Sequence, residues 1–346
     1  GDFVISLDNW YYGTMKQPVL IGRVNVKVLP PKNVSISVGT IRTGNAYANG
    51  EELAFDIGLK SLLPVRREAT VRYTVTNYET GEEIWTENIA LRGSESISRR
   101  VVVPTHKFGR FLLTTEVMDT SGVYASKVNT RYSYTAYDPK TMPANEAAGS
   151  CVHFSLEDRD SSVVAPLMAL TGMKYTRDEI WWHNYEKSPG VYRITDGDAA
   201  YLRDVENAGL DKLIILGFSN SVRMPGRPDR SALDAPQTKE ELKAWEDYCY
   251  NLAKDLGDRC NLYEVWNEPN PIESESIHKW YPEMVKAAYT GVKRANPNAK
   301  VIGGAFAGVY LDWNSEVFEQ AIDYMDGVSF HLYTDRDTMA DNGGFF

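Results

Sequence analysis

The chain contains 346 residues, enough for about two domains, and 43% are hydrophobic against 24% that carry a charge, which excludes wholesale disorder. No apolar run approaches the ~20 residues that a membrane-spanning helix needs, so we expect no membrane span. The net charge is −10, and the acidic excess falls on residues 141–346, which hold 33 acidic and 20 basic side chains. Nucleic acid is therefore not an expected partner.

Residues 19–140 show the sequence pattern of an all-β domain. Apolar side chains recur at every second position, as at Phe55, Ile57 and Leu59, and turn residues separate the runs. The pattern predicts about seven antiparallel strands in an immunoglobulin-like or fibronectin-like β-sandwich. Because its strands show no cluster of carboxylates and aromatic rings, we expect this domain to act as a support or spacer. Residues 1–18 fit poorly and are interpreted as the end of a preceding domain.

From residue 141 to residue 346, short apolar runs alternate with amphipathic helices, which predicts a parallel sheet. A doubly wound sheet also fits this alternation, but no glycine-rich turn follows the first run, as a dinucleotide site would require. We predict an incomplete (β/α)8 TIM barrel with about six of its eight strands. The expected strands are 151–156, 174–176, 212–216, 262–266, 301–303 and 328–331.

The strongest candidate for chemistry is Glu268, which follows the fourth predicted barrel strand. The carboxyl ends of barrel strands are where such enzymes place their active sites. Trp266 offers an apolar wall that would raise the pKa of a carboxyl group, and Asn267 offers both a donor and an acceptor to a neighbouring hydroxyl. The simpler interpretation is a surface loop with a helix-capping Asn. The flanking Trp and the position after a buried strand favour a general acid.

Other polar and aromatic side chains follow the remaining strands, and each has a structural alternative. Arg177 could hold a carboxylate ionised or form a surface salt bridge, and Trp182 could stack on a sugar or fill the core. His331 and Tyr333 project from one face of the sixth strand and could bind sugar hydroxyls. Two further residues point toward the same edge of the sheet, namely His153 and Asn220.

Several kinds of site are not indicated by the sequence. The five histidines are scattered without metal-ligand spacing, no cofactor motif is present, and no Gly-x-Ser-x-Gly sequence marks a hydrolase triad. We therefore predict neither metal nor cofactor. Three cysteines give no disulfide framework, although a Cys249–Cys260 bridge stays open as an alternative.

Over about residues 149–335, the chain resembles the clan A glycoside hydrolases, most closely family 39, which includes β-xylosidases. The resemblance rests on Trp266-Asn267-Glu268-Pro269-Asn270, on His331-x-Tyr333, and on Arg177 with the Trp182…Glu186…Gly190…Tyr192 run. It implies that Glu268 is the acid/base, that Asn267 holds the sugar 2-hydroxyl, and that His331, Tyr333 and Arg177 lie near the nucleophile. The family's nucleophile is a Glu at the end of the seventh strand, which we expect to lie beyond this chain.

These observations predict a retaining O-glycosidase that acts on a polysaccharide, oligosaccharide or glycoside, and that is secreted, periplasmic or on the cell surface. We expect a chain that ends at Phe346 to be inactive by itself, because the barrel would be open. One alternative is a non-catalytic carbohydrate-binding protein on a degenerate barrel. Another is an inverting hydrolase with Asp178 or Glu179 as its base, which would need a carboxyl separation of ~6.5–9.5 Å.

Overall fold

The computed structural model describes residues 34–61, 69–91, 96–119, 124–155, 160–269 and 273–331. These residues fall into two compact units, one made of 34–40 and 52–132 and the other of 41–51 and 133–331. Residues 1–18 and Tyr333, for which the sequence made predictions, lie outside the described residues. Among the described helices, none is both long and apolar enough to cross a membrane.

The first unit is built from antiparallel strands in two sheets. One sheet has the order β1-β3-β6, and the other has the order β2-β8-β7-β4-β5; at its edge, the short β2 and the last two residues of β8 pair in parallel and belong to the second unit. Alternate residues are buried, and Phe55 of β3 meets Tyr132 of β8 edge to face at 5.2 Å, so the two sheets share a core. The strands are β1 (Val34–Gly39), β2 (Ala46–Tyr47), β3 (Leu53–Ser61), β4 (Ala69–Asn77), β5 (Glu83–Leu91), β6 (Ser96–Val103), β7 (Gly109–Asp119) and β8 (Tyr124–Tyr134).

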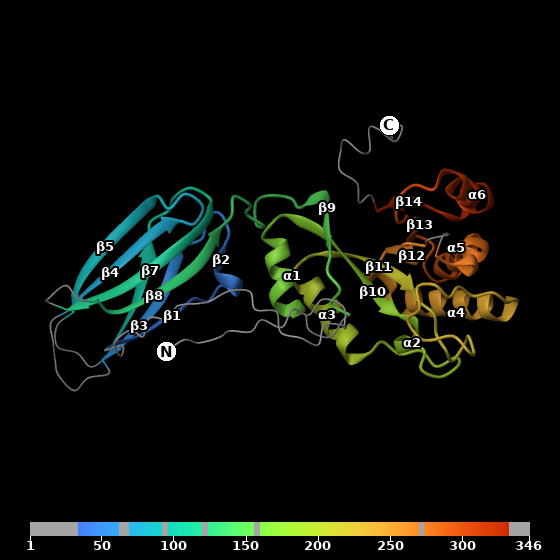
Figure 1. Ribbon diagram of the computed structural model, residues 1–346, viewed down its shortest axis with the longest axis horizontal. Helices are drawn as coiled ribbons and strands as arrows, with labels where there is room; N and C mark the ends of the chain where they lie inside the picture. Colours follow the sequence, from blue (N-terminus) through green and yellow to red (C-terminus); the bar gives the residue numbers. More distant parts are fainter. Residues whose placement is uncertain are drawn as a thin grey trace, which may run out of the picture. The chain divides into compact units, whose positions relative to one another are not determined.

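The second unit contains a six-stranded parallel sheet with the order β14-β13-β12-β11-β10-β9 (Figure 1). Each strand therefore pairs with its neighbour in the chain, which is the connectivity of a TIM-like barrel and not of a doubly wound sheet. The described residues thus contain six strands of an incomplete TIM-like barrel. The strands are β9 (Asn145–Cys151), β10 (Met173–Trp181), β11 (Asp211–Gly217), β12 (Leu262–Val265), β13 (Lys300–Phe306) and β14 (Gly327–Phe330).

Helices connect these strands and cover the sheet (Figure 1). They are α1 (Ser161–Ala169), α2 (Trp182–Tyr185), α3 (Asp196–Asn207), α4 (Lys239–Leu256), α5 (Glu275–Ala295) and α6 (Leu311–Ala321). The sequence sets their starts: Thr238 and Glu241 form a reciprocal capping box at α4, and Ser274 caps α5. Short 3-10 turns lie at Thr43–Asn45, Gly257–Arg259 and Ile322–Tyr324.

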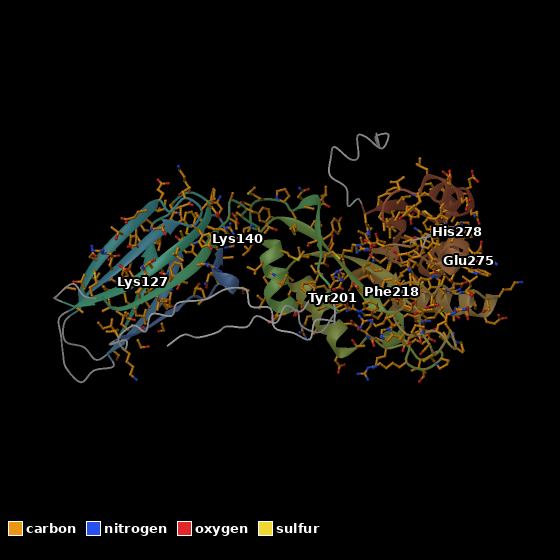
Figure 2. The ribbon with its side chains drawn as sticks, viewed as in Figure 1. Lys127, Lys140, Tyr201, Phe218, Glu275 and His278 are labelled. Carbon is orange, nitrogen blue, oxygen red and sulfur yellow. The ribbon has the colours of Figure 1, made fainter. Side chains whose placement is uncertain are left out.

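The core of this unit lies between the sheet and its helices and is rich in aromatic rings. Tyr201 on α3 and Phe218 after β11 are 2% and 7% exposed (Figure 2). The first barrel strand is the main difference from the sequence-based expectation. It was expected at 151–156, whereas β9 ends at Cys151, because the chain turns at His153 with φ 55°.

Candidate active site

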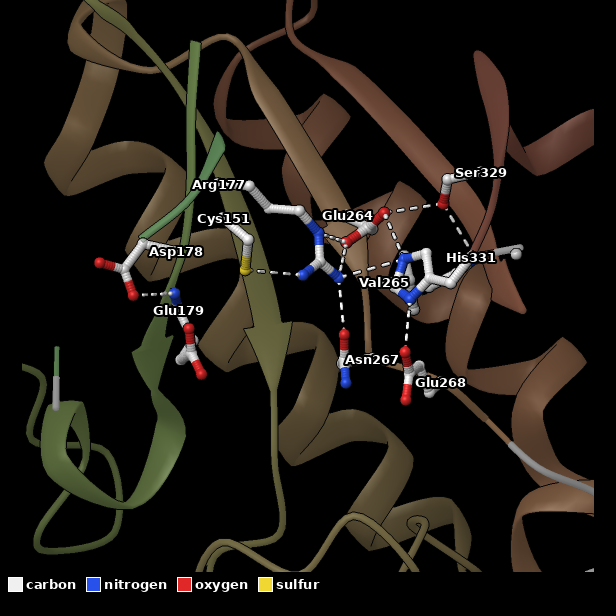
Figure 3. Close-up of polar contacts among 12 residues, drawn as sticks. Cys151, Arg177, Asp178, Glu179, Glu264, Val265, Asn267, Glu268, Ser329 and His331 are labelled. Atoms are coloured by element: carbon white, nitrogen blue, oxygen red, sulfur yellow. Dashed lines mark hydrogen bonds and ion pairs between the residues drawn. The ribbon is translucent and has the colours of Figure 1, made fainter. Parts of the chain in front are cut away.

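Charged and polar side chains from β9, β10, β12 and β14 meet at the carboxyl edge of the parallel sheet (Figure 3). The contacts join residues that are far apart in the sequence, so they depend on the strand order of the sheet. The cluster consists of Cys151, Arg177, Glu264, Asn267, Glu268, Ser329 and His331.

Glu264 lies at the centre of this cluster and is 1% exposed. Its Oε2 accepts a hydrogen bond from Arg177 Nε at 2.7 Å, and its Oε1 accepts one from Ser329 Oγ at 2.7 Å. Burial favours a higher pKa for Glu264, but the nearby His331 ring, the Arg177 charge and the hydrogen bond from Ser329 outweigh it and lower the pKa below its usual value. The buried carboxylate therefore stays ionised.

Arg177 connects Glu264 to two other members of the cluster. Its Nη2 donates to Asn267 Oδ1 at 2.7 Å, and its Nη1 lies 3.4 Å from Cys151 Sγ. Because Oδ1 faces the guanidinium, the Asn267 amide nitrogen points away from Arg177 (Figure 3). The amide is thus oriented to donate a hydrogen bond on the other side.

Glu268 and His331 form the second contact pair of the cluster. His331 Nδ1 lies 2.9 Å from Glu268 Oε1, and the Glu268 side chain is 31% exposed, so this carboxyl group can reach a ligand. The Glu264 carboxylate, whose Oε1 lies 3.9 Å from His331 Nε2, raises the pKa of His331 above its usual value, and although burial opposes this, the bond with Glu268 adds to it.

The backbone after β12 turns sharply before Glu268. Trp266 and Glu268 adopt positive φ angles of 68° and 53°, which non-glycine residues rarely do. Two hydrogen bonds hold this turn, because Trp266 N donates to the Leu216 carbonyl and Glu268 N donates to the Ala305 carbonyl, each at 2.9 Å. The neighbouring strands β11 and β13 therefore fix the position of Glu268.

Trp266 supports the turn from below. It is fully buried, contacts Phe218 edge to face at 4.9 Å, and donates from Nε1 to the Ala232 carbonyl at 3.0 Å. Its ring therefore packs in the core beneath the strand end.

A second group of titratable side chains lies at the ends of β9 and β10. His153 Nδ1 is 3.2 Å from a Glu179 carboxylate oxygen, and His153 Nε2 is 3.3 Å from Cys151 Sγ. With Asp178, the ligand atoms of His153 and Glu179 lie within 4.8 Å of one another, which is close enough for a metal ion. Asp178, however, already accepts hydrogen bonds from the backbone N–H groups of Phe154 and Glu179 and from Ser155 Oγ.

Two predicted substrate-binding residues lie in the core instead. Trp182 is fully buried, stacks on Tyr248 at 5.4 Å and donates to Glu186 Oε2 at 2.7 Å, so its ring has no free face for a sugar. Asn220 is also fully buried. Its amide donates to the Glu186 carbonyl at 2.9 Å and accepts from Val222 N, so it connects the loop after β11 to the segment after α2. Both sequence-based expectations were therefore wrong in this structure.

The structure brings together Arg177, Asn267, Glu268 and His331, and places His153 beside them through Cys151. The proposed Cys249–Cys260 bridge is absent, because both are buried free thiols.

Sequence reasoning assigned no role to Glu264 and Ser329. The signal for Glu264 was a charged residue inside an otherwise buried strand, because such a group needs a partner from another element.

No family model matches the sequence, and no curated protein is similar enough to match. Among solved structures, the chain is similar to a family 39 glycoside hydrolase from the gut symbiont Bacteroides cellulosilyticus WH2, with a TM-score of 0.61 and 19% identity. The alignment covers 83% of this chain and 56% of that one. The chain has the fold of a family 39 glycoside hydrolase over that region. It spans about half the length of the solved protein.

Weaker similarity links the chain to two other solved glycoside hydrolases. A β-glucuronidase from Bacteroides uniformis gives a TM-score of 0.37 at 12% identity, over 87% of this chain and 36% of that one. The endoglucanase Cel5A from Pseudomonas stutzeri gives 0.35 at 13% identity, over 46% of this chain and 50% of that one.

Proposed function

We propose that the protein is a retaining O-glycosidase for β-linked glycans or glycosides, with Glu268 as its general acid/base. The observation that carries the proposal is the placement of Glu268: a partly exposed carboxyl group, fixed at the end of a barrel strand and bonded to His331 at 2.9 Å. The similarity of the fold to a family 39 glycoside hydrolase supports the same reading. Glu268 would protonate the leaving oxygen and later deprotonate water.

The neighbouring side chains support a role in binding sugar hydroxyls. Asn267 is oriented by Arg177 so that its amide nitrogen can donate to the 2-hydroxyl of the sugar. The second carboxylate of a retaining mechanism would lie ~5 Å from Glu268, and by family resemblance we assign it to a Glu on a seventh strand. The first unit would serve as an immunoglobulin-like support, and a glycan substrate fits a secreted or cell-surface protein.

An inverting mechanism with Asp178 or Glu179 as the base is less well supported. The oxygens of Asp178 accept hydrogen bonds from Phe154 and Ser155, which follow β9, and from the neighbouring Glu179 N, and Glu179 is bonded to His153. A base must be free to accept a proton from water.

The test is substitution of Glu268 by Ala in the complete enzyme. A sugar alcohol leaves poorly without protonation, so hydrolysis of natural glycosides should fall by about 10²–10⁴-fold, whereas formation of the glycosyl-enzyme from an activated aryl glycoside should fall much less. Azide, which attacks the anomeric carbon without base assistance and releases the enzyme carboxylate, should restore turnover and give a product of retained configuration.

A matched control is Glu319→Ala, which removes an exposed carboxylate on α6. It should leave both substrates unaffected. Equal and modest losses on both substrates for Glu268→Ala, without azide rescue, would contradict the proposal. Binding of glycans without any turnover by the complete protein would favour a non-catalytic carbohydrate-binding protein.

A further inference from the structure

Glu264 is the most deeply buried charged member of the cluster, and it contacts every other charged member directly or through one residue. It is held by Arg177 from β10 and by Ser329 from β14, and it is almost completely buried. A buried charge is stable only when it is paired and hydrogen-bonded, and both conditions are met here. Because Glu264 is out of reach of solvent, its effect must pass through its partners.

One branch of contacts runs from Glu264 to Asn267. Arg177 donates to Glu264 from Nε and to Asn267 from Nη2, each at 2.7 Å. The guanidinium is planar and rigid, so fixing one edge fixes the other. The carboxylate of Glu264 therefore determines where Arg177 holds the Asn267 amide.

The other branch runs from Glu264 to Glu268. His331 Nε2 lies 3.9 Å from Glu264 Oε1, and His331 Nδ1 lies 2.9 Å from Glu268 Oε1. The charged groups that face His331 among the described residues are Glu264, Glu268 and Arg177, whose Nη2 is 3.4 Å from Nε2. The imidazole thus lies between two carboxyl groups and one guanidinium.

Charge balance indicates what this arrangement does. Two carboxylates and one guanidinium leave one negative charge, which a single proton shared by His331 and Glu268 neutralises. If Glu264 were neutral, the same proton would leave the group with a positive charge, so it would dissociate at lower pH. The two sites titrate as a coupled pair, since their interaction is direct.

We propose that Glu264 is a positioning residue whose fixed charge keeps one proton on the His331–Glu268 pair and whose salt bridge orients Asn267 through Arg177. The roles of Glu268 and Asn267 rest on the proposed function, but the retention of the proton does not. In a working glycosidase this proton is the one that Glu268 delivers to the leaving group.

The decisive experiment measures the titration of His331 in Glu264→Gln. The chain contains five histidines, and selective ¹³C labelling with a His331→Gln spectrum assigns the resonance. The apparent pKa of His331 should fall by about one unit or more relative to the unchanged protein, because an opposite charge at this distance typically shifts a pKa by that amount. An unchanged titration in the folded variant overturns the proposal.

Two further variants make the result specific. Glu316→Gln removes an exposed carboxylate that pairs with His278 at 3.5 Å, and should leave His331 unchanged. Glu264→Asp keeps the charge but moves it one methylene away, so it should lower the His331 pKa less than Gln does. If Glu264→Gln does not fold, the absence of any His331 shift in Glu264→Asp counts against the proposal.

Activity gives a second readout that separates the two proposals. If Glu268 is the general acid, the alkaline limb of kcat/KM should move to lower pH in Glu264→Gln by the same amount as the His331 titration. If the titration moves but Glu268→Ala loses no activity, the proposed function fails and the proton-retaining role of Glu264 stands. If activity depends on Glu268, but Glu264→Gln shifts neither the alkaline limb of kcat/KM nor the His331 titration, the proposed role of Glu264 is wrong.

Discussion

Two buried carboxyl groups, Glu264 and Asp178, are treated differently by their surroundings. Glu264 has a guanidinium as a partner and stays ionised, whereas Asp178 has only neutral donors and a second carboxyl group beside it. Burial, followed by the hydrogen bond and charge of Glu179, raises the pKa of Asp178 to about 7. The different partners therefore keep Glu264 ionised and allow Asp178 to titrate near neutrality.

Asp178 should make stability depend on pH. Its pKa is raised from 3.8 to about 7 on folding, so the folded state keeps a proton that the unfolded state has lost. The proton on Asp178 stabilises the folded state. This stabilisation is complete below about pH 4 and is lost as the pH rises through about 7, and the free energy of unfolding changes by at most ~1.4 kcal/mol per pH unit. Asp178→Asn should remove this part of the slope when urea unfolding is compared at pH 5 and pH 8. Asp323→Asn changes an exposed carboxylate and should leave the pH dependence of the free energy of unfolding unchanged. If Asp178→Asn showed the same pH dependence as the unchanged protein, Asp178 would not be its source.

At the scale of elements, the end of β12 and the contact between α4 and α5 decide how the site is built. The left-handed turn at Trp266 and Glu268 is anchored on both neighbouring strands, so β11 and β13 must be in register before Glu268 is in place. Helices α4 and α5 cover the same part of the sheet and approach closely at Gly291. Their close packing therefore supports the strands that carry the site.

Gly291 should tolerate no larger side chain. A Cβ atom there would lie 2.5 Å from the Glu246 carbonyl oxygen and 3.1 Å from Tyr250 N, both backbone atoms that cannot move aside without separating the helices. Gly291→Ala should therefore lower the free energy of unfolding by ~1–3 kcal/mol, measured by chemical denaturation. Gly197→Ala on α3 is the matched control, because its nearest atom would be 3.9 Å away. That change should be neutral or stabilising, and an equal loss at both positions would show that packing is not the cause.

At the scale of the whole molecule, the candidate site belongs entirely to the unit with the parallel sheet. The first unit, which we call the β unit, has a polar hollow of about 390 Å³ on one face of a sheet. It is lined by Arg72, Thr74, Thr76, Glu83, Thr86, Asn88, Thr114, Glu116 and Lys127. No aromatic ring lines this hollow, so it lacks the flat surface on which sugars stack.

Substitutions in this hollow should leave glycan binding unchanged. Arg72 donates to Asn88 at 3.2 Å, and changing both to Ala removes a polar side-chain contact between β4 and β5 on that face. In the full chain, glycan binding measured by calorimetry should match the unchanged protein, whereas Asn267→Ala should weaken it. A loss of binding in the Arg72 and Asn88 variant would assign recognition to the β unit.

Local sequence patterns determined the elements and much of the candidate site. Period-two alternation placed the strands, alternating strands and helices indicated a parallel sheet, and strand-end motifs selected Arg177, Asn267, Glu268 and His331. Each of these inferences needs only residues that are near one another in the chain, since side-chain direction and turn chemistry are local properties. The missing glycine-rich turn argued against a doubly wound sheet, and the strand order excluded it.

Tertiary structure alone decided which of those residues meet and which are buried. The bond from Arg177 to Glu264 joins positions 87 residues apart, and the contact of Arg177 with His331 spans 154 residues. Trp182 and Asn220 follow strand ends just as Asn267, Glu268 and His331 do, yet they are buried in the core. The burial of a side chain depends on what the rest of the chain packs against it. The sequence therefore named Glu268, but only the folded sheet placed the buried charge of Glu264 behind it.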